Sequence, residues 1–233
     1  MTEIPTAKEL EALFREGKME RIGDGSRRVC YALPGGKFCV KSYRSENDLD
    51  TRMKPDGTLE KHPLKPSVLR EIRRARFDEK RNTSCQEYRY WQELGRRLPV
   101  ELSAVFPEYV EQVLVPSHGW CLIENLICNA DGSPVRKFAM EYGASDEVRR
   151  DVLMRDMERL MRMLAGNRVR FYDPQNIMVQ TDTQGNFKLR IVDFEPVSRT
   201  LIPLDLLIPC LLPFRMRRRF SRFKSHLKGG VYV

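Results

Sequence analysis

Three side chains with oxygen atoms that can bind a metal ion flank one predicted hairpin. Asp173 and Asn176 belong to the stretch Asp-Pro-Gln-Asn, which precedes a short apolar strand, and Asp193 ends the strand that returns. Gly185 lies in the polar turn between the two strands and tolerates the positive φ of a tight turn. Carboxylate and amide oxygens suit Mg²⁺, so Asn176 and Asp193 are the predicted metal ligands. An ordinary hairpin with a surface Asn and Asp is the alternative.

The composition is typical of a globular protein that buries a core, with 233 residues, 41% hydrophobic and 31% charged. This length accommodates one domain of two lobes or two small domains. No apolar run is long enough to span a membrane, and the first residues lack the pattern of a signal peptide. The six cysteines are scattered without a CxxC pair, which argues against a zinc site and a disulfide framework. We therefore expect reduced thiols and a cytoplasmic location.

The net charge of +9 is concentrated near the C-terminus. Lys and Arg number 41 against 32 Asp and Glu, and seven of these cations lie between Arg215 and Lys228, where there is no acid. The remainder of the chain therefore carries 34 cations against 32 acids, or +2. This distribution argues against a nucleic-acid-binding surface on the body of the protein.

Apolar residues recur at helical spacing within this basic segment, at Met216, Phe220, Phe223 and Leu227. One interpretation is a final helix that docks on the preceding domain and exposes a solvated basic face. A second is a membrane-surface helix over residues 215–228 that meets anionic lipid. A nucleic-acid-binding arm is the third.

A further group of candidate residues lies near the start of the chain. Gly23, Gly25 and Ser26 form a G-x-G-S turn between two predicted strands, where backbone N–H groups can approach phosphates. Lys41 follows an apolar pair at the end of a strand, as the phosphate-binding lysine of protein kinases does. The alternatives are a plain hairpin turn, since the third glycine of GxGxxG is missing, and a solvated lysine.

Two glutamates complete the predicted nucleotide site. A helix over about residues 84–97 carries Glu87 beside its apolar stripe, where a kinase-like arrangement pairs this carboxylate with Lys41. A solvated glutamate on a helix face is the alternative. Glu124 ends the second of two predicted strands and would begin the segment that meets an adenine edge. Residues 48–80 are interpreted as an insertion.

The order of these parts is that of protein kinases, and a long helix predicted from Ser145 to about Ala165 precedes the loop with Asp173. The chain also resembles the YrbL family, small bacterial kinase-like proteins described as members of the PhoP regulatory network. The resemblance covers most of the chain apart from the first 18 or so residues and the insertion. It lies in residues 25–31, 39–41, 94–98, 131–134, 174–177 and 199–204, together with the basic tail. It implies a protein-kinase-like fold that binds ATP with Mg²⁺.

The loop departs from the kinase pattern. Protein kinases place an Asp five residues before the metal-binding Asn, where it accepts the proton of the substrate hydroxyl, and here that position is Phe171. Glu195 stands where kinases have a glycine. The loop of the YrbL family looks like Leu-Lys-Pro-Gln-Asn, so Asp173 stands at the position of its Lys. Asp173 is also the one acid in the loop that could replace the missing base. The alternative is that Asp173 caps the turn at Pro174.

The sequence thus predicts a two-lobed α+β protein-kinase-like fold. A small β-rich N-lobe covers residues 1–128, a mostly helical C-lobe covers 129–214, and a basic amphipathic tail covers 215–233. The leading functional hypothesis is nucleotide binding with atypical or weak phosphotransferase activity on an envelope-related substrate, at the inner membrane surface. The rival is a catalytically inactive kinase fold that serves as a regulatory or scaffold module, with a protein partner, in a PhoP-type stress response.

Overall fold

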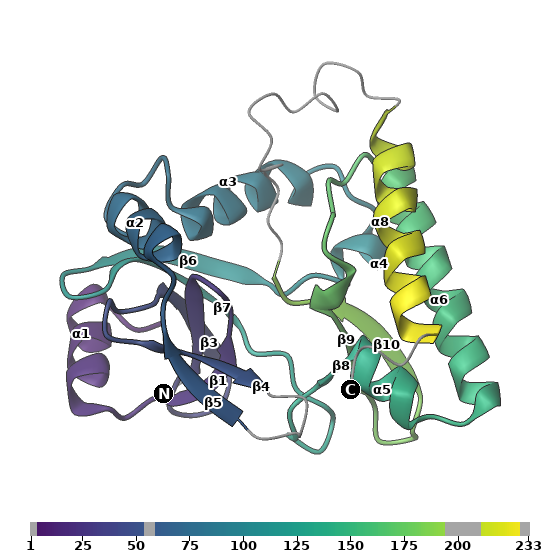
Figure 1. The fold of residues 1–233 in the computed structure, drawn as a ribbon, viewed down its shortest axis with the longest axis horizontal. Coiled ribbons are helices and arrows are strands. Elements are labelled where there is room, and N and C mark those ends of the chain that lie inside the picture. Colours follow the sequence, from purple (N-terminus) through teal and green to yellow (C-terminus); the bar gives the residue numbers. More distant parts are fainter. Residues whose placement is uncertain (1–3, 54–58, 194–210, 229–233) are drawn as a thin grey trace. The chain divides into compact units, whose positions relative to one another are not determined.

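A computed structural model of the chain describes residues 4–53, 59–193 and 211–228 (Figure 1). Its contacts divide the chain into two compact units, which we call unit 1 and unit 2. Unit 1 comprises Met1–Arg89 and Glu108–Leu126, and unit 2 comprises Tyr90–Pro107 and Ile127–Val233. The chain therefore passes between the units more than once.

Residues 90–107, which the sequence analysis placed in the N-lobe, belong to unit 2. The reason lies in two hydrogen bonds to the hairpin of unit 2, one between backbone groups and one from a side chain. The Ile191 N–H donates to the Val105 carbonyl over 2.9 Å, and Arg190 Nη2 donates to the Phe106 carbonyl over 3.1 Å. Nothing in the local pattern of residues 90–107 indicates these distant partners.

Unit 1 is built on a five-stranded antiparallel sheet with the strand order β1-β2-β3-β7-β6. Its strands are β1 (Glu20–Asp24), β2 (Arg28–Ala32), β3 (Phe38–Tyr43), β6 (Tyr109–Val115) and β7 (Gly119–Asn125). The strand β3 is central in the sheet, and all six of its residues are buried, Lys41 among them. The lysine is therefore not a solvated residue at the end of a strand.

One face of this sheet packs on helix α1 (Ala7–Glu16). Leu10 of the helix is fully buried with apolar residues of the sheet, among them Val40 and Ile123. A capping box fixes the start of the helix, because Thr6 and Glu9 satisfy each other's backbone N–H groups. These contacts stabilise the sheet from the side of the N-terminal helix.

Two helices and a small hairpin complete unit 1. The hairpin consists of β4 (Leu49–Met53) and β5 (Leu59–Pro63), and it leads into α2 (Pro66–Ala75). These elements lie within the predicted insertion, so the described part of residues 48–80 has regular structure. Helix α3 (Thr83–Gly95) begins in unit 1 and ends in unit 2.

The turn between β6 and β7 touches the chain just after α2. The Trp120 N–H donates to the Arg76 carbonyl over 3.0 Å. Gly119 has a φ of +74°, and a Cβ on this residue would lie only 2.2 Å from the Arg76 carbonyl oxygen. This close approach requires glycine on both conformational and steric grounds.

Unit 2 combines helices with a three-stranded sheet of order β10-β9-β8. The predicted hairpin forms from β9 (Ile177–Thr181) and β10 (Phe187–Ile191), which pair antiparallel with Phe187 opposite Thr181. The remaining described elements are α4 (Val100–Ser103), β8 (Arg136–Lys137), α5 (Phe138–Ala144), α6 (Glu147–Gly166), the 3₁₀ turn η1 (Pro174–Asn176) and α8 (Leu211–Lys228).

Helix α8 packs against α6, as Figure 1 shows. Met216, Phe223 and Leu227 are buried at 1%, 3% and 8% exposure, and Lys224 pairs with Glu158 of α6 over 2.7 Å. Of the interpretations given for this segment, the structure therefore has the docked helix. A free membrane-surface helix would need this apolar stripe on its outer face, but most of the stripe is part of the core of unit 2.

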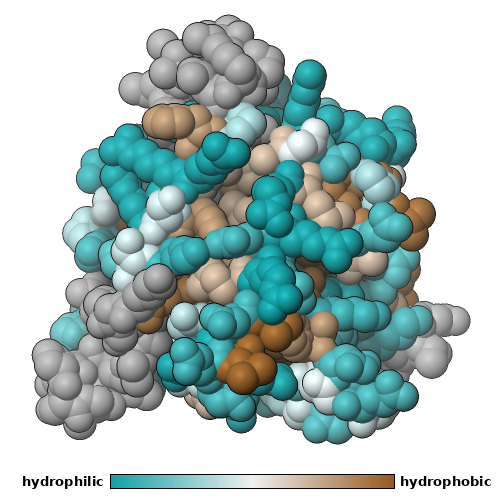
Figure 2. All heavy atoms as spheres, turned by 90° about the vertical axis from the view of Figure 1, so that its right-hand side faces the viewer, coloured by the Kyte–Doolittle hydropathy of each residue, from teal (hydrophilic) through white to brown (hydrophobic). Residues whose placement is uncertain are grey.

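The outer face of α8 carries the exposed cations Arg217, Arg218, Arg219 and Arg222. Figure 2 looks onto this side of unit 2 and shows a mostly hydrophilic surface with smaller hydrophobic patches. Among the described residues, no helix combines the length and apolar character needed to cross a bilayer. The mixed architecture of helices and antiparallel sheets confirms the α+β part of the predicted fold class.

Candidate functional site

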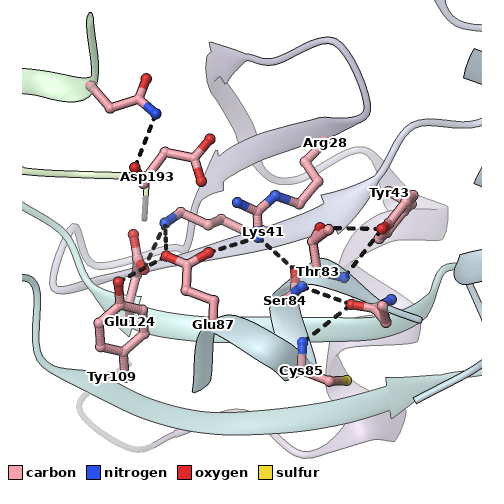
Figure 3. A network of polar contacts seen from close by, with 12 residues as sticks. Arg28, Lys41, Tyr43, Thr83, Ser84, Cys85, Glu87, Tyr109, Glu124 and Asp193 are labelled. Atoms are coloured by element: carbon pink, nitrogen blue, oxygen red, sulfur yellow. Dashed lines mark hydrogen bonds and ion pairs between the residues drawn. The ribbon is translucent and has the colours of Figure 1, made fainter. Parts of the chain in front are cut away.

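A cluster of buried charged side chains lies in unit 1 (Figure 3). Lys41 of β3 contacts two carboxylates, Glu87 of α3 and Glu124 of β7. Arg28 of β2 and Tyr109 of β6 complete the cluster through contacts with Glu87. Four strands and one helix of unit 1 therefore each contribute one side chain to the same place.

Glu87 is fully buried, with an exposed fraction of 0%. Its carboxylate accepts hydrogen bonds from Lys41 Nζ over 3.2 Å, from Arg28 Nη1 over 2.7 Å and from the Tyr109 hydroxyl over 2.8 Å. An isolated buried carboxylate costs several kcal/mol, and these three donors, two of them cationic, offset the cost of burying Glu87. The predicted Lys41–Glu87 pair is present, and the solvated alternative for Glu87 is wrong.

The start of α3 is fixed by a cap that the sequence analysis missed. The buried side chain of Asn82 accepts hydrogen bonds from the backbone N–H groups of Ser84 and Cys85, over 2.9 and 3.3 Å. The Tyr43 hydroxyl of β3 accepts from the Thr83 N–H over 3.2 Å. An Asn just before a helical stretch is a strong N-cap signal, so Asn82 is identifiable from the sequence. Together these bonds hold the first turn of α3, and with it Glu87, close to β3.

Glu124, which was predicted to begin the segment that meets an adenine edge, lies in the charged cluster beside Lys41. Its side chain points into unit 1, is 3% exposed and places Oε2 at 2.9 Å from Lys41 Nζ. The Cys39 thiol is a weak donor to Oε1 over 3.7 Å. Burial raises the pKa of Glu124 to about 7, although the ammonium of Lys41 opposes this shift. The sequence analysis did not predict this contact, because β7 pairing alone decides which face Glu124 occupies.

The G-x-G-S turn is closed by its own backbone. The Gly25 N–H donates to the Arg28 carbonyl over 2.8 Å, and Arg44 Nε donates to the Gly25 carbonyl over 2.8 Å. Gly23 lies inside β1 at an irregularity of the pairing with β2, and the side chain of Ser26 is exposed. The plain hairpin turn thus describes this geometry, and phosphate binding by Gly23, Gly25 and Ser26 stays a prediction.

In unit 2, the predicted metal ligands lie at the base of the β9–β10 hairpin. The Asn176 side chain donates from Nδ2 to the backbone carbonyl of Asp193 over 2.9 Å. The Val192 N–H donates to the Asn176 carbonyl over 3.1 Å. These bonds bring Asn176 and Asp193 together across the two ends of the hairpin, as the sequence analysis predicts. Asn176 lies in the 3₁₀ turn η1. Pro174 favours the start of this turn, because its ring fixes φ near the helical value.

Asp173 is exposed, and its side chain accepts a hydrogen bond from the Gln175 N–H over 3.2 Å. This is the predicted cap of the turn at Pro174. Phe171 is buried, with an exposed fraction of 1%. The residue at the place of the usual catalytic Asp is therefore part of the apolar core of unit 2. Glu195, the second departure from the kinase pattern, lies outside the described residues.

No protein-family model matches the chain, and a search of curated proteins gives no match.

Sequence reasoning did not single out two members of the charged cluster, Arg28 and Tyr109. Both lie on strands that flank β3 and β7, and nothing in their local sequence indicates that they meet Glu87. Over residues 4–53, 59–193 and 211–228, no group of three or more His, Cys, Asp or Glu side chains is placed to hold a metal ion. Asn176 and Asp193 alone are the predicted metal ligands that the structure brings together.

Proposed function

We propose that this chain is a nucleotide-binding protein of the protein-kinase-like class, related to the YrbL family. The observation that carries the proposal is the buried contact between Lys41 on a central strand and Glu87 on a helix, 3.2 Å apart. In protein kinases the equivalent pair holds the lysine ready for the phosphates of ATP. The residues are 46 positions apart in the sequence, and the order of motifs along the chain predicts the same pair.

A purely structural ion pair is the competing interpretation. Buried ion pairs give little net stability, because the loss of hydration offsets most of the attraction between the charges. A cluster of two cations and two carboxylates is therefore a costly way to hold a sheet against a helix. Perturbed ionisable groups are enriched at functional sites, which supports a binding role for this cluster.

Asn176 and Asp193 support the metal part of the proposal. Mg²⁺ is usually held by one or two protein oxygens, the substrate phosphates and several waters, so a short protein ligand set fits this ion. Asp193 supplies a carboxylate and Asn176 an amide oxygen at the base of one hairpin. When bound, the ion would neutralise charge on the nucleotide phosphates.

The first experiment measures melting temperature with ATP and Mg²⁺, because a ligand that binds the folded state raises it by mass action. We expect a rise for the wild type and none for Lys41→Met. The matched control is Lys37→Met, at an exposed lysine just before the same strand, which should keep the wild-type response. Asp193→Ala should lose only the Mg²⁺-dependent part. A wild type with no response at millimolar nucleotide would contradict the proposal.

The second candidate function, an inactive regulatory or scaffold module, is favoured by one observation. Phe171 fills the place of the usual base and is buried in apolar surroundings, so it neither accepts a proton nor orients a hydroxyl. Within the described loop, Asp173 is the acid that remains as a candidate for weak phosphotransfer, and its side chain already caps the turn.

A comparison of wild type with Asp173→Asn separates the two functions. Asn keeps the acceptor oxygen of the cap and removes the basic carboxylate. If Asp173 is a surrogate base, slow ATP hydrolysis or autophosphorylation falls by about 10²-fold or more, with melting temperature unchanged. Equal rates in both proteins, or no turnover in either, leave Asp173 as a cap and favour the inactive module. Asp182→Asn in the β9–β10 turn is a control for loss of charge on an exposed cap.

A further inference from the structure

The ammonium of Lys41 lies between two carboxylates, and a bound phosphate would be a third anion at the same place. We propose that Glu124 limits the affinity of Lys41 for phosphate-bearing ligands, because its carboxylate competes with phosphate for the ammonium. This inference rests on the nucleotide-binding function proposed above and concerns how that binding is controlled. It assigns to Glu124 a role other than the predicted adenine contact.

The contact between Lys41 and Glu124 is a product of strand pairing. Strands β3 and β7 are hydrogen-bonded neighbours, with Cys39 opposite Glu124 and Lys41 opposite Leu122. Because side chains alternate along a strand, Lys41 and Cys39 share one face of the sheet, and Glu124 shares it with them. Both partners lie on central strands and are at most 6% exposed. The competitor is therefore fixed in place by the sheet.

The two carboxylates are held unequally. Glu87 accepts hydrogen bonds from a lysine, an arginine and a tyrosine. Glu124 has the ion pair with Lys41 and a long contact from the Cys39 thiol, and its Oε2 accepts no well-aligned hydrogen bond. Glu87 is thus held by more hydrogen bonds than Glu124, and Glu124 is the carboxylate that gives up its contact with Lys41 when a phosphate binds.

Both positive and negative side chains act on Glu124. Lys41 reaches it from β3, Glu87 from α3 and Arg28 from β2, and the neutral groups Cys39 of β3 and Tyr109 of β6 complete its surroundings. A phosphate adds negative charge to this buried set, which favours uptake of a proton by Glu124. Since burial already raises the pKa of Glu124 to about 7, this proton is readily supplied near neutral pH.

Nucleotide binding is therefore coupled to proton uptake. As pH falls through about 7, Glu124 takes up a proton, and its carboxyl group competes less with a phosphate for the ammonium of Lys41. As pH rises above 7 the carboxylate regains its charge, and affinity falls by up to about tenfold for each pH unit. Replacement of Glu124 by Gln removes the competing charge and the titration together.

The test is the dissociation constant of ATP with Mg²⁺, measured by isothermal titration calorimetry between pH 6.5 and pH 8.5. We expect the wild type to bind about tenfold more weakly at pH 8.5 than at pH 7. At pH 8.5, Glu124→Gln should bind about tenfold more tightly than the wild type, with a flatter pH profile. The matched control is Glu111→Gln, an exposed glutamate on β6, which should follow the wild type. The comparison also cancels the titration of the nucleotide itself.

A second measurement needs no variant. Titrations of the wild type at pH 8 in two buffers of different ionisation enthalpy report the number of protons taken up on binding. We expect up to one proton for the wild type. Equal affinities and equal pH profiles in wild type and Glu124→Gln, or no proton uptake, would overturn the role of Glu124 and leave the proposed function intact. No nucleotide binding by any variant at any pH would overturn both, and binding by Glu124→Gln alone would support both.

Discussion

The Tyr109 hydroxyl donates a hydrogen bond to the carboxylate of Glu87 over 2.8 Å, inside unit 1. This bond joins β6 to α3 and supports the carboxylate that in turn contacts Lys41. A hydrogen bond to a charged acceptor is worth about 1.5–3 kcal/mol, roughly twice a neutral one. Tyr109 is thus a positioning residue for the charged cluster, and Lys41 Nζ lies 5.9 Å from the centre of its ring.

We predict that Tyr109→Phe lowers the free energy of unfolding by about 1.5–3 kcal/mol, because Glu87 loses a donor while its charge stays buried. Urea denaturation measures the change. Tyr88→Phe is the control, since the Tyr88 hydroxyl makes only a long contact of 3.5 Å with the Val110 carbonyl. Equal losses in the two variants would show that the bond to Glu87 has no special weight.

The pH dependence of stability should differ between wild type and Glu124→Gln. Burial raises the pKa of Glu124 to about 7, against about 4.3 for an ordinary glutamate in the unfolded chain. The folded protein therefore holds this proton more tightly. The contribution of the protonated Glu124 to stability is fully present below pH about 4, and it is lost as pH rises through about 7.

The loss amounts to about 4 kcal/mol at most, because the two pKa values differ by about 2.7 units and each unit is worth about 1.4 kcal/mol. We expect the wild type to lose stability relative to Glu124→Gln between pH 5 and pH 8, measured by urea denaturation at several pH values. Titration of all other groups cancels in the difference. Parallel curves for the two proteins would contradict the raised pKa.

Phe171→Ala should destabilise the protein by about 3–5 kcal/mol, the usual cost of removing a fully buried phenylalanine. Phe214→Ala, at a residue with 65% exposure, should change stability by less than about 0.5 kcal/mol. Phe171→Asp would not restore a kinase base, because the carboxylate would enter an apolar core without partners. Recovery of phosphotransfer by that variant would show that the loop differs from this description.

Truncation after Pro213 should unfold unit 2, because Met216, Phe223 and Leu227 of α8 belong to its core. Phe223→Ala should cost about 3–5 kcal/mol, and thermal unfolding measures both changes. If the truncated protein failed to bind lipid vesicles, unfolding of unit 2 would explain the loss, so truncation is not a test of membrane binding.

The membrane hypothesis is better tested on the outer face of α8. Each basic residue near an anionic surface contributes about 1 kcal/mol, and salt screens this attraction. We expect wild type to co-sediment with anionic vesicles at low salt, and a variant with Gln at Arg217, Arg218, Arg219 and Arg222 to lose this binding without a change in melting temperature. Unchanged binding by this variant would contradict the hypothesis.

Gly119→Ala should destabilise unit 1 by about 2–4 kcal/mol, since it adds both strain at positive φ and a clash with the Arg76 carbonyl. Gly132→Ala is the matched control, with a φ of +81° and no atom within 4 Å of the added carbon. The difference between their melting temperatures isolates the clash. Equal effects would mean that the turn moves away from Arg76 at little cost.

Much of the secondary structure was predictable because each element has a local signal. Lys41 and Glu87 were predicted as a pair because motif order fixes which strand and which helix must meet. The contact between Glu124 and Lys41 was not predictable, since a residue at the end of a strand faces either side and only the pairing with β3 decides. The stripe on α8 was ambiguous for a similar reason, because a docked helix and a membrane-surface helix need the same apolar spacing.

The interleaved chain has a consequence for biosynthesis. Strands β6 and β7 of unit 1 follow a stretch that belongs to unit 2, so unit 1 is not complete when its first 89 residues leave the ribosome. Unit 2 in turn lacks part of its core until α8 has been made. The earlier helices and the hairpin of unit 2 therefore expose apolar side chains until α8 has been synthesised. During this time aggregation competes with folding, and chaperones matter most.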